Sequence, residues 1–189
     1  AIDGTGCAHL IWSDGRHATD GIRMDIYATK RLFTGAWEAS GVKVNDDDTA
    51  AQEESEPVVA VTPGGDAFVV WTEGQSSAGW DTDIYFAHRP VGGTWGAPER
   101  VNDVKAGDQY EPRIAVDSQG NAYAVWTDER TGPEGVYFAY RPTAGTWSAN
   151  HCIASGRATA PAIAVDSEGN AYVIWEQDIH NINEEIRFA

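Results

Sequence analysis

One short stretch, repeated along the chain, constrains the fold more than any other feature. The segment Pro112–Trp126, PRIAVDSQGNAYAVW, predicts a strand, a tight turn and a second strand. Apolar residues alternate with small or polar ones in its first half, and its second half is rich in β-branched and aromatic residues. Asp117 suits the start of an Asx-type turn, and Gly120–Asn121 tolerate a positive φ. The segment therefore predicts a β-hairpin.

The same hairpin returns three more times. It is PAIAVDSEGNAYVIW at Pro161–Trp175, PVVAVTPGGDAFVVW at Pro57–Trp71 and, without its proline, AIDGTGCAHLIW at Ala1–Trp12. Four copies of one hairpin in a chain of 189 residues indicate a repeat architecture.

A second pair of strands is expected after each hairpin, so that each repeat holds four antiparallel strands. Such units are typical of β-propeller blades, and no segment shows the sustained period of a helix. We predict an all-β chain forming one propeller domain or propeller segment over residues 1–189, with blades at about 1–56, 57–111, 112–160 and 161–189. An immunoglobulin-like sandwich is the competing all-β fold, but it does not predict four near-identical hairpins.

The outermost strand of each blade is expected at Ala36–Val44, Thr94–Val101 and Thr146–Ile153, each containing a tryptophan, and the fourth blade lacks this strand. The innermost strand of the first blade is expected at Ala1–Asp3. The connections that vary in length follow the second and fourth strands of each repeat. In an up-and-down sheet these two connections lie at the same end, which therefore carries the adaptable loops.

The charge balance limits the classes of partner. The formal net charge is −16, hydrophobic residues make up 42% of the chain and there are eight tryptophans. This composition supports a packed core. It disfavours nucleic acids and anionic membranes, which bind basic surfaces. No apolar run approaches the ~20 residues of a membrane span. We expect neither nucleic-acid binding nor membrane insertion.

Neither the start of the chain nor its cysteines define a compartment. Ala1 already lies inside an expected strand, so the chain resembles a mature or trimmed piece, and the absence of a signal peptide is uninformative. Cys7 and Cys152 belong to different repeats, and we do not expect a disulfide between them.

The turn between the third and fourth strands resembles a known motif. It reads YFAHRPVGGTWGAPERV from Tyr85 and YFAYRPTAGTWSA from Tyr137. This is similar to the Asp-box of the sialidase-like, BNR-repeat propellers, Ser-x-Asp-x-Gly-x-Thr-Trp. Thr94 and Trp95 match its second half, whereas Pro90 stands where the motif has aspartate. The resemblance covers the whole chain as architecture and implies a sialidase-like propeller with degenerate Asp-boxes.

The catalytic residues of that family do not carry over. The family uses three arginines to bind a carboxylate, a Tyr–Glu nucleophile pair and an aspartate. The nearest match to its Arg-Ile-Pro motif is Arg113-Ile114, with proline on the wrong side. Arg16 and Arg130 follow second strands, where they could equally pair with Asp14 and Asp128. We therefore assign no catalytic residue.

Ligand-binding side chains are expected at the end that carries the adaptable loops. Trp80 lies outside the repeat pattern, and a loop tryptophan can stack on a sugar or anchor a protein, or cover a neighbouring blade. The candidate ligand-binding residues are Asp14, Arg16, His17, Glu73, Trp80, Asp128 and Arg130.

Acidic groups gather at the same end and suggest a cation site. Ca²⁺ takes about 6–8 oxygen ligands. Candidate ligands are Asp25, Asp46, Asp83 and Asp103, and further acids on this rim are Glu134, Glu176 and Glu185. No D-x-D-x-D-G loop is present, so the alternative is a set of solvated loop ends with Asp–Arg pairs. Ca²⁺ is the one cofactor the sequence suggests.

We expect a non-catalytic, extracellular or cell-surface (secreted) binding module that recognises a glycan or protein through its loops. One alternative is a sialidase-like glycoside hydrolase whose catalytic residues lie partly outside this chain, because paired carboxylates can hydrolyse glycosides. Another is a structural blade array in a larger surface assembly. Further expected partners are the remaining blades of the same propeller or a second copy of the chain.

Overall fold

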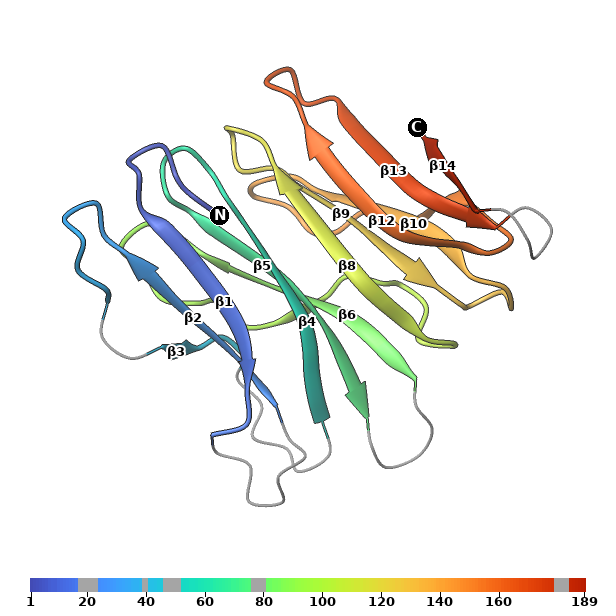
Figure 1. Cartoon of the computed structure of the whole chain (residues 1–189), viewed down its shortest axis with the longest axis horizontal. Helices are drawn as coiled ribbons and strands as arrows, with labels where there is room; N and C mark the ends of the chain where they lie inside the picture. Colours follow the sequence, from blue (N-terminus) through green and yellow to red (C-terminus); the bar gives the residue numbers. More distant parts are fainter. Residues whose placement is uncertain (17–23, 39–40, 46–51, 76–80, 179–183) are drawn as a thin grey trace.

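The computed structural model describes residues 1–16, 24–38, 41–45, 52–75, 81–178 and 184–189, and all regular structure in them is β. These strands form four separate antiparallel sheets (Figure 1). The first sheet holds β1 (Ala8–Asp14), β2 (Asp25–Arg31) and β3 (Val42–Lys43), and the second holds β4 (Gln52–Val61), β5 (Ala67–Gln75), β6 (Thr82–Arg89) and β7 (Glu99–Arg100). The third holds β8 (Gln109–Val116), β9 (Ala122–Asp128), β10 (Gly135–Arg141) and β11 (His151–Ala154), and the fourth holds β12 (Ala158–Val165), β13 (Ala171–Asp178) and β14 (Glu184–Phe188).

The sheets follow one another in chain order, as blades do (Figure 1). Strands β4, β8 and β12 are neighbours, each being the first strand of its sheet. A hollow lined by residues 2–4, Val61, Pro63, 116–118 and 165–167 brings together the hairpin turns of all four repeats. We call this side of the molecule the hairpin end and the opposite side the loop end. The prediction of an all-β chain built from four antiparallel sheets is confirmed, and none of the described sheets closes on itself.

Each hairpin turn is organised by one side chain, as the sequence predicts. Oδ1 of Asp117 accepts hydrogen bonds from the backbone N–H groups of Gln119 (2.9 Å) and Asn121 (3.0 Å). Asp3 and Asp166 make the corresponding bonds in the first and fourth blades. Burial disfavours the charged form of Asp117, but hydrogen bonds from Asn121, Gln119 and Tyr123 outweigh it and lower the pKa of this carboxyl.

Side chains from neighbouring blades pack into three apolar cores. Trp71 is buried between the first and second blades, Trp126 between the second and third, and Trp175 between the third and fourth. Because these tryptophans occupy the same position in each hairpin, the repeat in the sequence is a repeat of blade packing.

The edge strands differ from the prediction. The expected innermost strand Ala1–Asp3 is reduced to one bridge between Ile2 and Ala8. The outermost strands begin later than expected, and Trp95 and Trp147 precede β7 and β11. After the tight turns of the second and third blades the chain makes one backbone hydrogen bond to the third strand, such as Gly96 N to His88 O (2.9 Å), before regular pairing starts.

The innermost strands begin earlier than predicted because each continues past a β-bulge. The register shifts at Glu56-Pro57, at Glu111-Pro112 and at Ala160-Pro161. Glu56, Glu111 and Ala160 have φ values of 51°, 55° and 49°. Proline has no backbone N–H to donate to the neighbouring strand, and at a β-bulge this hydrogen bond is not needed.

Both cysteines are free, with Cys152 exposed. Within the described ranges, no helix has the length and apolarity of a membrane span.

Candidate functional site

Four candidate residues belong to an Asp–Arg arrangement that occurs twice. It is formed by Asp14 and Arg16 in the first blade and by Asp128 and Arg130 in the third. The Trp126 indole N–H donates to Asp128 Oδ2 (2.8 Å), and Arg130 donates to both oxygens of Asp128 (2.9 and 2.7 Å). The Arg130 guanidinium lies 4.3 Å from the centroid of the Tyr137 ring. These are charge-assisted and cation–π contacts within one blade.

The first blade repeats this arrangement with Trp12, Asp14, Arg16 and Tyr27. Hydrogen bonds from Arg16 and Trp12 hold the pKa of Asp14 well below its usual range. These four of the seven predicted ligand-binding residues are therefore engaged by partners within the chain, and their binding of a ligand stays a prediction.

The equivalent position in the fourth blade is Gln177, which accepts from the Trp175 indole at 3.2 Å. Glu176, one of the predicted rim acids, lies one residue before this position. In the second blade the position is Glu73, a buried residue paired in register with the buried Glu54. Trp71 Nε1 has no hydrogen-bond partner in the described part of the chain.

The loop end between the second and third blades is closed by polar contacts. Asp103 accepts from Arg130 Nη1 (2.6 Å) and from the backbone N–H of Asn150 (3.0 Å), while Asn150 Oδ1 accepts from the backbone N–H of Asp103 (2.7 Å). Burial opposes ionisation of Asp103, but the bonds from Asn150 and Arg130 prevail and lower its pKa. The buried Gln109 donates to the carbonyls of Ala106 and Gly107, which holds the linker in place.

The candidate metal ligands Asp25, Asp83 and Asp103 lie apart in ion pairs. Asp25 pairs with Lys43 (2.9 Å) and accepts from Asn45, and Asp83 pairs with Arg100 (3.4 Å) and accepts from Asn102. Across the described residues, no group of three His, Cys, Asp or Glu side chains is placed to hold a metal ion. The predicted Ca²⁺ site therefore has no geometry to support it among these residues. Asp46, His17 and Trp80 lie outside the described residues.

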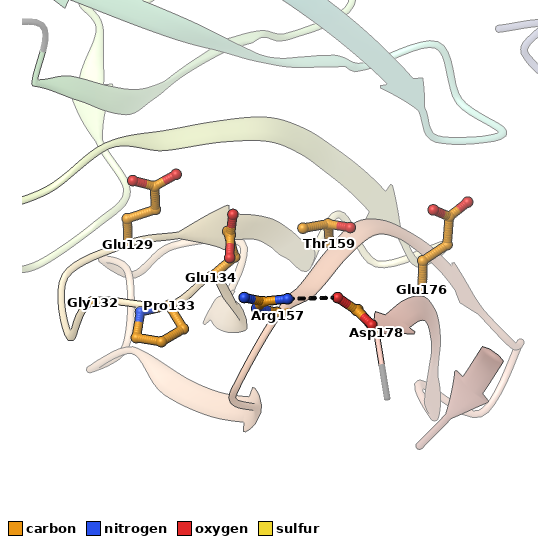
Figure 2. Close-up of a pocket in the computed structure, with 8 residues that line it drawn as sticks. All are labelled: Glu129, Gly132, Pro133, Glu134, Arg157, Thr159, Glu176 and Asp178. Atoms are coloured by element: carbon orange, nitrogen blue, oxygen red, sulfur yellow. Dashed lines mark hydrogen bonds and ion pairs between the residues drawn. The ribbon is translucent and has the colours of Figure 1, made fainter. Parts of the chain in front are cut away.

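A hollow of about 500 Å³ opens at the loop end between the third and fourth blades. Figure 2 shows the carboxylates of Glu129, Glu134 and Glu176 on one side of an Arg157–Asp178 ion pair. The two atoms of that pair, Nη1 and Oδ2, are 2.9 Å apart. The lining residues are Glu129, Gly132, Pro133, Glu134, Arg157, Thr159, Glu176 and Asp178.

Two of these carboxylates are unengaged. Glu134 and Glu176 are half-buried, and their carboxylates make no hydrogen bond or ion pair within the described part of the chain. Glu129 instead accepts from the Tyr110 hydroxyl (3.1 Å), and burial followed by this bond raises the pKa of Tyr110. The hollow thus presents free hydrogen-bond acceptors beside a guanidinium group.

A short connection leaves this hollow open. Residues 155–157 join β11 to β12, whereas residues 101–108 join β7 to β8. The shorter linker turns through Gly156 and Arg157, both at positive φ (79° and 65°), and lacks the equivalents of Asn102 and Asp103 that fill the preceding interface. The rim acids Glu134 and Glu176 were identified from the sequence, but Arg157, Glu129 and Asp178 were not. The unequal linker lengths were the signal that could have located the hollow.

Neither a family model nor a curated protein matches the chain. Solved structures do match. An ulvan lyase is 14% identical over 100% of this chain and 50% of its own, with a TM-score of 0.71. An endo-arabinase of Bacteroides thetaiotaomicron is 11% identical over 100% of this chain and 71% of its own, with a TM-score of 0.57. An α-L-arabinanase of Penicillium chrysogenum, in complex with arabinobiose, is 12% identical over 96% of this chain and 56% of its own, also at 0.57.

These matches support the fold alone. The chain spans about half the length of the lyase. The predicted resemblance to the sialidase-like family is not supported, because these structures are propellers of other enzyme types. In the turn between the third and fourth strands of the second blade, the Gly93 N–H donates to the Pro90 carbonyl (2.9 Å), so the turn is closed without the Asp-box carboxylate. What the comparisons establish is that this chain has a propeller-like, all-β fold.

Proposed function

We propose that this chain is a non-catalytic, extracellular carbohydrate-binding module that holds a neutral glycan in the hollow between its third and fourth blades. The observation that carries the proposal is the pair of half-buried, unengaged carboxylates of Glu134 and Glu176 lining that hollow. A carboxylate accepts hydrogen bonds from neighbouring sugar hydroxyls, and Arg157 supplies donors for ring or hydroxyl oxygens.

The size and charge of the hollow fit such a ligand. Its volume of about 500 Å³ lies in the range of small-ligand sites. Four carboxylates and one guanidinium line it, and the whole chain carries a net charge of −16. An anionic sugar would be repelled, so a neutral glycan is favoured over a uronate or sulfated one. The solved arabinanase binds arabinobiose, which makes neutral arabino-oligosaccharides the first ligands to test.

Calorimetric titration with arabino-oligosaccharides and, separately, with ulvan oligosaccharides tests this function. We expect binding of the neutral series only, weakened about tenfold or more by Glu134→Gln or Glu176→Gln, because each change removes a charged acceptor. Glu168→Gln, at the hairpin end of the fourth blade, is the matched control and should bind normally. Binding that is unchanged in both hollow variants would contradict the proposed site.

A glycoside hydrolase is the second candidate, because two free carboxylates facing one hollow are also what hydrolysis of a glycosidic bond requires. Assays of reducing-sugar release on the same oligosaccharides separate the two functions. Hydrolysis that Glu134→Gln or Glu176→Gln abolishes would replace the binding module by an enzyme.

A further inference from the structure

The outward face of the fourth blade repeats an interface that occurs inside the chain. In register, Val70 on β5 pairs with Phe86 on β6, and Val125 on β9 pairs with Phe138 on β10. Val70 and Phe86 pack against the third blade, and Val125 packs against the fourth. Each blade thus offers the same positions to the blade that follows it.

The fourth blade holds those positions with large apolar residues that are exposed. Ile174 on β13 pairs with Phe188 on β14, at the register of the pairs above, and Ile186 stands two residues before Phe188. Ile174, Ile186 and Phe188 are 48%, 66% and 84% exposed. Tyr172 belongs to the same face and is also exposed. We call these four residues the trailing face.

The first blade exposes the complementary positions. Val69 of the second blade and Ala124 of the third blade pack against the preceding blade, and both are fully buried. The equivalent residue of the first blade, Leu10, is 42% exposed. Trp37, which corresponds to Trp95 and Trp147 by its place after the turn that follows the third strand, is exposed as well. Leu10 and Trp37 form the leading face.

We infer that the trailing face of one copy docks on the leading face of a second copy, so that two chains pair head to tail through two equivalent blade interfaces. A second copy of the chain is the partner that the internal interfaces favour. At each interface within the chain, the position equivalent to Ile174 in one blade packs with the position equivalent to Leu10 in the next. A twofold pair covers both exposed faces of both chains at once. A trailing face against another trailing face would instead leave both leading faces exposed.

Light scattering coupled to size exclusion, over a range of concentrations, tests the pairing. We expect the 189-residue chain to reach twice its mass of 20.4 kDa. Ile174→Lys and Leu10→Lys should each shift the chain to the single mass, since a lysine at either face must be desolvated on docking. Val91→Lys, at an exposed apolar residue in a turn away from both faces, is the control and should still pair. Circular dichroism spectra confirm that the variants remain folded.

A mixture of the two variants gives the sharpest readout. Ile174→Lys retains a native leading face and Leu10→Lys a native trailing face, so an equimolar mixture should recover part of the double mass through one intact interface. A single mass for the wild-type chain at every concentration would overturn the inference. So would a pair that Leu10→Lys leaves intact, because that result requires contact between two trailing faces.

Discussion

The interface between the second and third blades is closed at the loop end, whereas the interface between the third and fourth is open there. Asp103, Asn150 and Arg130 bridge the first interface, and the carboxylates of Glu134 and Glu176 line a hollow in the second. Both interfaces have a buried tryptophan at their centre. The apolar packing is thus common to both, and the difference lies in the linkers. Apolar packing positions the blades, and a linker that is too short to cover its interface leaves a hollow at the loop end.

The largest expected effect comes from the shared tryptophans. Trp126→Ala should lower the free energy of unfolding by about 3–5 kcal/mol, since it empties a fully buried site between two four-stranded blades. Trp175→Ala should cost less, because Trp175 is 8% exposed whereas Trp126 is fully buried. Denaturant unfolding of both variants measures the difference. Equal losses would show that the two interfaces are equally rigid.

The next effect separates the two Asp–Arg pairs. Asp128→Asn should cost about 3 kcal/mol, because Asp128 is fully buried and its removal leaves the Arg130 guanidinium, which is 9% exposed, without its main counter-charge. Asp178→Asn should cost about 1 kcal/mol or less, since Arg157 is 52% exposed. The matched changes are compared by chemical denaturation. A large loss for Asp178→Asn would mean that the Arg157 pair is structural and not part of an adaptable site.

The smallest effect is a pH dependence of the closed interface. The folded pKa of Asp103 is lowered, so its contribution to stability is present above its ordinary pKa and is lost as the pH falls through the lower folded value. Acidification from pH 5 to pH 2 should therefore destabilise the wild type slightly more than Asp103→Asn. Carboxyl NMR titration of Asp103 gives the direct measurement. A midpoint at or above the ordinary value of an aspartate would contradict the bridge to Asn150 and Arg130.

The sequence was sufficient for the fold wherever the repeat itself carried the information. The hairpins, the turn role of Asp117 and the core role of Trp126 follow from local pattern and turn chemistry, and all appear in the structure. The early starts of β4, β8 and β12 could not be predicted, because the bulges at Glu56, Glu111 and Ala160 combine a positive φ with a following proline, which local propensity disfavours.

The site was harder to predict, because acidic residues occur at similar positions in several repeats and the sequence does not show which of them are paired. Asp14, Asp128 and Asp103 had the composition of a ligand or metal site, yet the structure pairs each of them with an arginine. Glu134 and Glu176 had the same appearance in the sequence. What distinguishes them is the short linker 155–157, whose length can be read from the sequence but whose effect on the interface is seen only in the structure.

The inter-blade hydrogen bonds of the two bulge glutamates, Glu56 and Glu111, all run the same way along the chain, with each carboxylate accepting from the next blade. Glu56 Oε2 accepts from Thr72 Oγ1 in its own blade (3.0 Å) and from the backbone N–H of Glu111 in the next (2.8 Å). Glu111 repeats both bonds with Thr127 (3.1 Å) and with the backbone N–H of Ala160 (2.9 Å). Glu111 therefore links blades in both directions. Its carboxylate accepts a hydrogen bond from the following blade, and its backbone N–H donates to the glutamate of the preceding blade. A duplicated blade that kept its Glu-Pro dipeptide could make both inter-blade hydrogen bonds without further change. The array could therefore gain blades by duplication.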